Sequence, residues 1–158
     1  CERSYQNPMN IHVNCTKGDL ADIAARFMSN LNKCDQSVTS RLVVENEDKG
    51  CWNVTNLLKH FELPITFDNL HHKCNHDEQI SCELAAMDWC ADTWLNVKPL
   101  FHYSESHPEK TNPRSHADMP TDFPASDTYD WDIELKSKDA AIRACAAIAD
   151  NNCAGVDK

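Results

Sequence analysis

Nine cysteines constrain the folding of this 158-residue chain more strongly than any other feature of its sequence. They are spread along the chain, and no two of them show the Cys-x-x-Cys spacing of zinc ribbons or thioredoxin-like motifs. This density in a short chain is typical of the disulfide framework of a secreted protein. We therefore predict about four disulfides, with one cysteine unpaired or bonded to a second chain. The predicted framework comprises Cys1, Cys15, Cys34, Cys51, Cys74, Cys82, Cys90, Cys145 and Cys153.

Other features of the sequence agree with an extracellular location. The chain opens at Cys1 without a basic and apolar leader, which predicts a mature form that has lost its signal peptide. Asn53 and Asn14 each begin a triplet that fits the N-glycosylation pattern, so both are glycosylation candidates. No stretch approaches the roughly 20 apolar residues of a membrane-spanning helix. We predict a secreted protein without a membrane span, either extracellular or translocated into host cells.

The charge and the glycine content exclude several classes of function. The chain carries 25 acidic and 15 basic residues, for a formal net charge of -10. Proteins that bind DNA use Lys and Arg to displace phosphate counterions, so we predict no nucleic-acid partner. The three glycines, Gly18, Gly50 and Gly155, are too few and too scattered for a glycine-rich phosphate loop or a Gly-x-Ser-x-Gly elbow.

Hydrophobic periodicity predicts a mixture of strands and helices, with a strand and an amphipathic helix at each end of the chain. The predicted strands are 9–15, 38–45, 63–67 and 129–135, and the predicted helices are 18–33, 54–61, 75–95 and 137–153. The alternation of apolar and polar residues in 9–15 and 129–135 marks one sheet face as solvent-exposed, which favours antiparallel pairing. We therefore predict an α+β fold, a roughly four-stranded antiparallel sheet with amphipathic helices packed on it and about four disulfides.

The domain organisation is predicted to be simple. A chain of this length supports one hydrophobic core, so we predict a single disulfide-bonded domain over 1–158. Residues 102–128 contain four prolines and lack periodicity, which predicts a long surface loop that exposes His102.

The stretch from His71 to His76 is the most metal-like part of the sequence. Neutral imidazole is the commonest metal ligand, and His71, His72 and His76 are close enough in sequence to share an ion. A polar loop leading into the next helix explains the same residues, and we favour that interpretation. We predict no metal and no cofactor, with these three histidines as weak candidates.

No spacing singles out a catalytic trio, so we predict no catalytic residues and a protein that is not an enzyme. Asp130, Asp132 and Glu134 recur with period two, which is typical of the solvent-exposed face of a strand. Exposed loops on a rigid scaffold often carry recognition, and the loop histidines His107 and His116 follow that rule. We predict that these five residues form a contact surface for a partner protein.

The outline resembles the small cysteine-rich effectors of plant-pathogenic fungi, and within them the Leptosphaeria avirulence and suppressing (LARS) family. Segment 11–20 runs into the helix that ends at Cys34, and segment 130–135 precedes the helix with Cys145 and Cys153. The resemblance implies an antiparallel sheet held by disulfides, no catalytic site, and a virulence role recognised by or hidden from host immune receptors. The expected partner is a host protein or receptor, and the expected state is a monomer.

Two alternatives remain from other functional classes. A secreted small-ligand carrier of the odorant-binding or salivary type shares the acidic charge, the cysteines and several helices. A secreted inhibitor of a host enzyme shares the predicted architecture and differs only in its partner.

Overall fold

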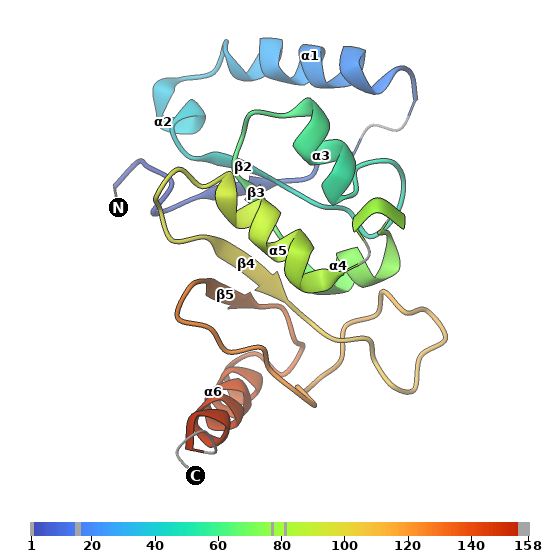
Figure 1. Ribbon diagram of the computed structural model, residues 1–158, viewed down its shortest axis with the longest axis vertical. Coiled ribbons are helices and arrows are strands. Elements are labelled where there is room, and N and C mark those ends of the chain that lie inside the picture. Colours follow the sequence, from blue (N-terminus) through green and yellow to red (C-terminus); the bar gives the residue numbers. More distant parts are fainter. Residues whose placement is uncertain (1, 15–16, 77, 81, 155–158) are drawn as a thin grey trace.

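The computed structural model describes residues 2–14, 17–76, 78–80 and 82–154 as a chain of alternating strands and helices (Figure 1). The strands are β1 (Met9–Ile11), β2 (Leu42–Glu45), β3 (Ile65–Thr66), β4 (Leu100–Tyr103) and β5 (Asp130–Ile133). The helices are α1 (Leu20–Leu31), α2 (Gln36–Thr39), α3 (Val54–His60), α4 (Asn69–Cys74), the 3-10 helix η1 (Glu78–Ile80), α5 (Glu83–Asp92) and α6 (Asp139–Ala154).

All strand pairs in the described part of the chain are parallel. β2 lies between β1 and β3 in one sheet, and β4 pairs with β5 in a second. A parallel bridge between Asp68 and His102 joins the two sheets, and the His102 N–H donates to the Phe67 carbonyl at 2.8 Å. The strands therefore follow one another in chain order, as in a segment of a parallel β/α barrel.

The predicted antiparallel sheet is wrong. That prediction rested on the alternation of apolar and polar residues in the outer strands β1 and β5. Exposed and half-buried residues alternate along β5, whereas both Asn10 and Ile11 of β1 are exposed. The central strand β2 is buried at all four of its positions, which is typical of a parallel sheet covered on both faces. The alternation of apolar and polar residues in an outer strand indicates which of its faces is covered. It does not indicate whether the strand pairs in a parallel or an antiparallel way.

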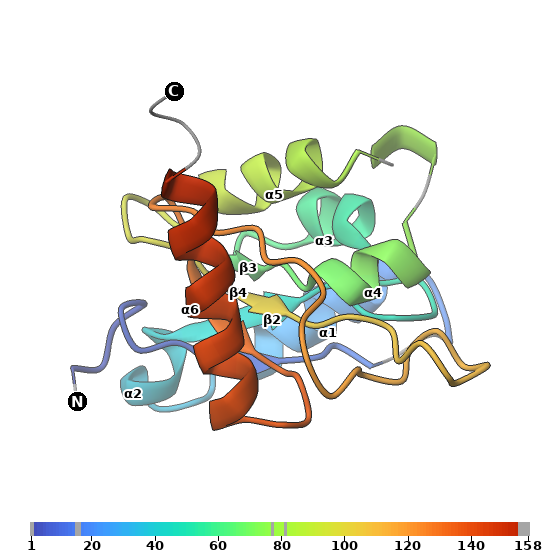
Figure 2. The same ribbon diagram turned by 90° about the horizontal axis from the view of Figure 1, so that it is seen from below.

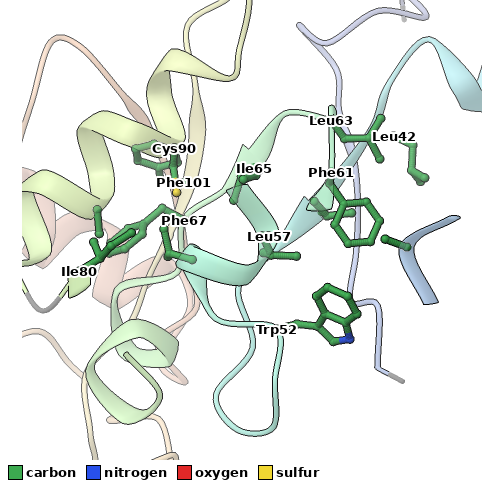
Figure 3. Close-up of a cluster of buried hydrophobic side chains, with 14 of the residues drawn as sticks. Leu42, Trp52, Leu57, Phe61, Leu63, Ile65, Phe67, Ile80, Cys90 and Phe101 are labelled. Atoms are coloured by element: carbon green, nitrogen blue, oxygen red, sulfur yellow. The ribbon is translucent and has the colours of Figure 1, made fainter. Parts of the chain in front are cut away.

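The main core packs helices α1, α3 and α5 against β2 and β3. Trp52, Leu57, Ile65 and Phe67 are fully buried there, and Figure 3 shows Trp52 close to Phe61. A second, smaller core joins α6 to the strand pair β4–β5. Its buried members are Tyr103, Ala117, Leu135, Ala141 and Cys145. Helix α6 lies at the end of the molecule opposite α1 (Figure 1), so it is in the foreground when the molecule is seen from below (Figure 2).

Side-chain caps begin several of the helices. Asp19 accepts hydrogen bonds from the N–H groups of Ala21 and Asp22 at the start of α1. Asn53 caps α3 by accepting from the Asn56 N–H at 3.0 Å. A short polar side chain in this position satisfies N–H groups that have no partner within the helix. Helices were predicted where α1, α3 and α6 lie, whereas the predicted helix 75–95 contains the separate elements η1 and α5, and α4 was not predicted.

The predicted disulfide framework is absent from the described part of the chain. Cys34, Cys74, Cys82, Cys90 and Cys145 are free thiols, and Cys51 packs against the main core. Cys90 and Cys145 are buried, where a thiol behaves as a small apolar side chain. The side chains of three more framework members fall outside the described residues: Cys1, Cys15 and Cys153.

Residues 104–129 join β4 to β5 without a helix or strand and extend beyond the strands in both views (Figure 1, Figure 2). His102 and Tyr103 belong to β4, so the expected exposure of His102 is wrong: it is 7% exposed. None of the described helices is long and apolar enough to cross a membrane.

The main core gives a stability prediction. Replacing the fully buried Leu57 by Ala leaves a cavity, so we expect the free energy of unfolding to fall by about 2–5 kcal/mol. The matched control Leu84→Ala, at a position that is 71% exposed, should change it by less than about 0.5 kcal/mol. Urea denaturation followed by tryptophan fluorescence measures both, and equal losses would contradict this core assignment.

Candidate functional site

Polar side chains gather where the five parallel strands end. Glu45 is the last residue of β2, and His102 lies near the end of β4. His12, Asp68 and Glu134 follow β1, β3 and β5 by one or two residues. Parallel strands bring their carboxyl ends to one edge, which is the usual place for a functional site in such folds.

The Glu45 carboxylate is the centre of this cluster. It is buried, with a residue exposure of 2%, and three imidazole nitrogens surround it. His71 Nδ1 lies 3.1 Å and His102 Nδ1 3.3 Å from Oε1, and His12 Nε2 lies 3.4 Å from Oε2. Asn10 donates a further hydrogen bond to Oε2. These partners offset the cost of removing the charge from water.

Hydrogen bonds to both backbone groups of Asp68, its N–H and its carbonyl, fix the position of this residue. Its N–H donates to Asn46 Oδ1 at 2.8 Å, and its carbonyl accepts from Asn46 Nδ2 at 3.0 Å. Its Oδ1 caps α4 by accepting from the His71 N–H at 2.7 Å. Its second oxygen, Oδ2, is buried and has no hydrogen-bond partner.

Glu134 and His116 extend the cluster toward β5. Glu134 Oε1 lies 3.3 Å from His102 Nδ1, and His116 Nδ1 lies 4.0 Å from Oε2. The same His116 nitrogen is 2.8 Å from the Glu134 carbonyl. A carbonyl only accepts, so His116 carries its proton on Nδ1, and Nε2 is the unprotonated nitrogen of the neutral ring.

The carboxylates of the cluster have pKa values displaced in opposite directions. Burial opposes ionisation of Glu45, but the adjacent imidazoles of His102 and His71 outweigh it and hold the pKa well below its usual range. Burial raises the pKa of Asp68 to about 6, although the nearby His71 lowers it in part. A buried acid whose pKa is raised is a common feature of functional sites.

The acidic neighbours of His71 and His102 raise the pKa values of both imidazoles. Burial alone would lower the pKa of His71, but the hydrogen bond with Glu45 and the charge of Asp68 raise it to about 9. The pKa of His102 is also raised, because contacts with Glu45 and Glu134 outweigh the effect of burial.

The donor set fits a divalent metal ion. Ligand atoms of His12, Glu45 and His71 lie within 4.8 Å of one another, and so do those of Glu45, Asp68 and His102. The two groups share Glu45. Imidazole and carboxylate are ligands of Zn²⁺, Mn²⁺ and Fe²⁺. His102 Nδ1 is buried and close to two carboxylates without forming a hydrogen bond, as expected of a metal ligand.

The structure separates the predicted histidines. His71 lies in the cluster, whereas His72 is buried against Phe67, with ring centroids 5.3 Å apart. His76 stacks on His72 and approaches its carbonyl. Consecutive residues of a helix point about 100° apart, so these three imidazoles do not converge.

The five residues of the predicted contact surface also lie in different parts of the structure. Glu134 and His116 belong to the cluster, while Asp130 pairs with Lys98 at 2.7 Å and Asp132 is exposed. His107 lies 3.8 Å from Asp118, in the segment after β4.

The glycosylation candidates have structural roles. Asn53 caps α3, and Asn14 donates its N–H to Glu47 at 2.6 Å in the left-handed region, with a φ of 50°. These contacts involve the Asn53 side chain and the Asn14 backbone.

Most residues of the cluster were not predicted from the sequence. His12, Glu45, Asp68 and His102 were not recognised as a group, because they are far apart in sequence. A signal was present: an acid or a histidine ends or follows each hydrophobic strand, as Glu45 does after Leu42-Val43-Val44. In parallel sheets such residues meet at one edge. Because we predicted antiparallel pairing, we did not expect these residues to lie together.

Comparison with known proteins identifies the family. A family model described as UV-endonuclease UvdE matches residues 1–154. The chain belongs to this family. The UV DNA damage endonuclease of Bacillus pumilus is 31% identical over 148 residues, which cover 85% of this chain and 46% of that protein. The UV-damage endonuclease of Schizosaccharomyces pombe is 31% identical over 145 residues, 84% of this chain and 24% of that protein.

A solved UvdE structure has the same fold. The crystal structure of SacUVDE superimposes with a TM-score of 0.78 at 26% identity, over 93% of this chain and 53% of that one. This chain therefore spans about half the length of the bacterial relative and of SacUVDE. The parallel strand order thus agrees with that of a known UvdE protein.

Membership of the UvdE family overturns the effector prediction. The resemblance to the LARS family is wrong, and so are the carrier and inhibitor alternatives. The relatives are named endonucleases, so the prediction of a protein that is not an enzyme is wrong as well. The LARS resemblance rested on element order and cysteine placement, which many unrelated folds share.

The predictions of secretion, of a host-protein partner and of no nucleic acid are also wrong. Secretion rested on disulfides that the described cysteines do not form, and the relatives are named for damaged DNA. Net charge misled us because it counts Glu45, Asp68 and Glu134 as free negative charges, although they lie together in a site suited to cations.

The raised pKa of His71 predicts how stability depends on pH in metal-free protein. The charged ring is stabilised in the folded state, so its contribution is complete below the unfolded pKa of about 6.5 and is lost as pH rises through about 9. The free energy of unfolding should therefore fall between these pH values in EDTA.

His71→Gln should flatten this dependence, whereas His107→Gln, outside the cluster, should retain it. Urea denaturation at pH 6.5, 7.5 and 9 measures the effect. An unchanged slope in His71→Gln would show that His71 is not the titrating group.

Proposed function

We propose that this chain hydrolyses phosphodiester bonds in UV-damaged DNA with a divalent metal ion bound at the strand-end cluster. The observation that carries the proposal is the buried Glu45 carboxylate with three imidazole nitrogens within 3.4 Å. UvdE relatives named UV DNA damage endonucleases support the choice of substrate. Because the chain spans about half of the bacterial relative, the activity is proposed for this chain and requires a direct test.

The two groups that share Glu45 would hold the ion or ions. One group comprises His12, Glu45 and His71, and the other comprises Glu45, Asp68 and His102. A divalent ion in such a site supplies Lewis-acid stabilisation for the negative charge that develops on a phosphoryl oxygen. Hard and borderline ions such as Mn²⁺ suit this mixture of carboxylate and imidazole.

Residues around the cluster keep the ligands in place. Asn10 orients the Glu45 carboxylate, and Asn46 fixes both backbone groups of Asp68. His71 Nδ1 lies 2.8 Å from the Asn46 carbonyl, which places a proton on that nitrogen and leaves Nε2 as the His71 atom that could bind an ion. Such outer contacts fix the tautomer and the ring direction of a ligand before the ion binds.

The proposed reaction is hydrolysis and needs no further reactant. The hydroxyl group of water bonds to phosphorus, one P–O ester bond breaks, and the proton of the water passes to the leaving oxygen. Asp68 would hold the ion as an ionised carboxylate, because a carboxyl group loses its proton when it binds a metal.

Removing the central carboxylate tests this proposal. Glu45→Gln keeps the size of the side chain and removes its charge, so we expect nicking of UV-irradiated plasmid in Mn²⁺ to fall at least about 100-fold. Asp130→Asn removes the same charge at an exposed position that is paired only with Lys98 among the described contacts, and should retain activity. Gel electrophoresis of supercoiled and nicked DNA gives both rates.

Two results would contradict the proposal. One is nicking by Glu45→Gln at the wild-type rate. The other is wild-type nicking that persists unchanged after the protein is freed of metal with EDTA. Circular dichroism of both variants shows whether a lost activity comes from the site or from unfolding.

A further inference from the structure

The three imidazoles around Glu45 differ in their access to solvent. The side chain of His12 is 43% exposed, against 14% for His71 and 9% for His102. The carboxylate side chain between them is 3% exposed. Of the three imidazoles, His12 is therefore the one that a ligand from solvent reaches most easily.

A cavity of about 300 Å³ lies on this side of the cluster. The described residues of its wall are His12, Asn14, Glu47, Asp48, Lys49 and His71. The ring centroids of His12 and His71 are 5.5 Å apart, so two proposed ligands of the ion form part of the wall. One water molecule needs about 10–15 Å³, so the cavity has room for a group of several atoms such as a phosphate.

Lys49 supplies a positive charge to this cavity. It is exposed, and it is the only lysine or arginine among the described residues of the wall. The two carboxylates of the wall have other partners: Glu47 Oε1 accepts from the Asn14 N–H at 2.6 Å, and Asp48 pairs with Arg114 at 3.3 Å. Lys49 forms no ion pair with any described residue. Its ammonium group is thus available to an anion that enters the cavity.

Hydrogen bonds hold the turn that carries Lys49 against α4. Asn75 Nδ2 donates to the Glu47 carbonyl at 3.0 Å and to the Gly50 carbonyl at 3.3 Å. Gly50 has a φ of 82°, in the left-handed region that glycine adopts without strain. Asn75 is the C-cap of α4, the helix that carries His71. The backbone at Lys49 is therefore fixed relative to a proposed ligand of the ion.

We propose that Lys49 binds the DNA phosphate that is cleaved, in the cavity that it shares with His12 and His71. This inference rests on the proposed function and extends it to a residue outside the metal ligands. An ammonium group donates charge-assisted hydrogen bonds to a phosphate oxygen. Such a contact stabilises the negative charge that develops as the P–O bond breaks, and it carries no information about the base sequence.

The salt dependence of DNA binding tests the phosphate contact without cleavage. A fluorescein-labelled duplex, irradiated or not, is titrated with the 158-residue protein in EDTA at several NaCl concentrations, and anisotropy gives the Kd. For Lys49→Gln we expect the slope of log K against log salt to become shallower by about one, because one phosphate contact is lost. The affinity should fall by a similar factor for both duplexes. Lys49→Arg keeps the charge and should retain the wild-type slope.

Nicking of UV-irradiated plasmid in Mn²⁺ tests which phosphate is bound. Lys49→Gln should nick at least about 10-fold more slowly than the wild type, because the charge that it loses faces the reacting phosphate. The matched control Lys59→Gln removes the same charge at an exposed position on α3, and should keep both the slope and the nicking rate. Titration with Mn²⁺ should show that Lys49→Gln still binds the ion.

Each further outcome has a separate meaning. An unchanged slope in Lys49→Gln, with normal nicking by the wild type, overturns the inference alone. A shallower slope with nicking at the wild-type rate overturns the assignment to the cleaved phosphate. A shallower slope without any nicking by the wild type supports the phosphate contact and overturns the proposed endonuclease activity. No measurable binding of either duplex by the wild type contradicts both proposals.

Discussion

The buried charge of Glu45 is the constraint on which the rest of the site depends. A carboxylate that is 2% exposed is costly unless cations or hydrogen-bond donors surround it, and here three histidines do so. The histidines come from the residue after β1, from α4 and from β4, so the carboxylate links separate parts of the chain. The parallel order of the strands makes this arrangement possible, because it brings all five carboxyl ends to one edge.

The distribution of charge agrees with the proposed action on DNA. Several carboxylates are concentrated at the cluster, where a divalent ion would offset them. The net charge of -10 counts these groups as free charges, so it does not describe the field beside the cluster. The segment 104–129 carries His116 and packs against the residues after β5.

Local features were predictable from the sequence, and non-local ones were not. The helices α1, α3 and α6 followed from apolar periodicity within single segments, whereas the helix predicted over 75–95 is two shorter elements, η1 and α5. Strand direction and the cluster depend on residues far apart, such as Glu45 and His102, which no single segment reveals. The cysteines misled because buried thiols such as Cys90 serve as small apolar residues, so their number does not define a redox compartment.

The most direct test of the account is to locate Mn²⁺ by anomalous diffraction in crystals of this protein. The account predicts a peak within about 2.5 Å of the Glu45 carboxylate, with nitrogen ligands from His12 and His71 or from His102. Peaks confined to exposed carboxylates such as Asp130, with none beside Glu45, would contradict a metal-dependent centre at the ends of the strands.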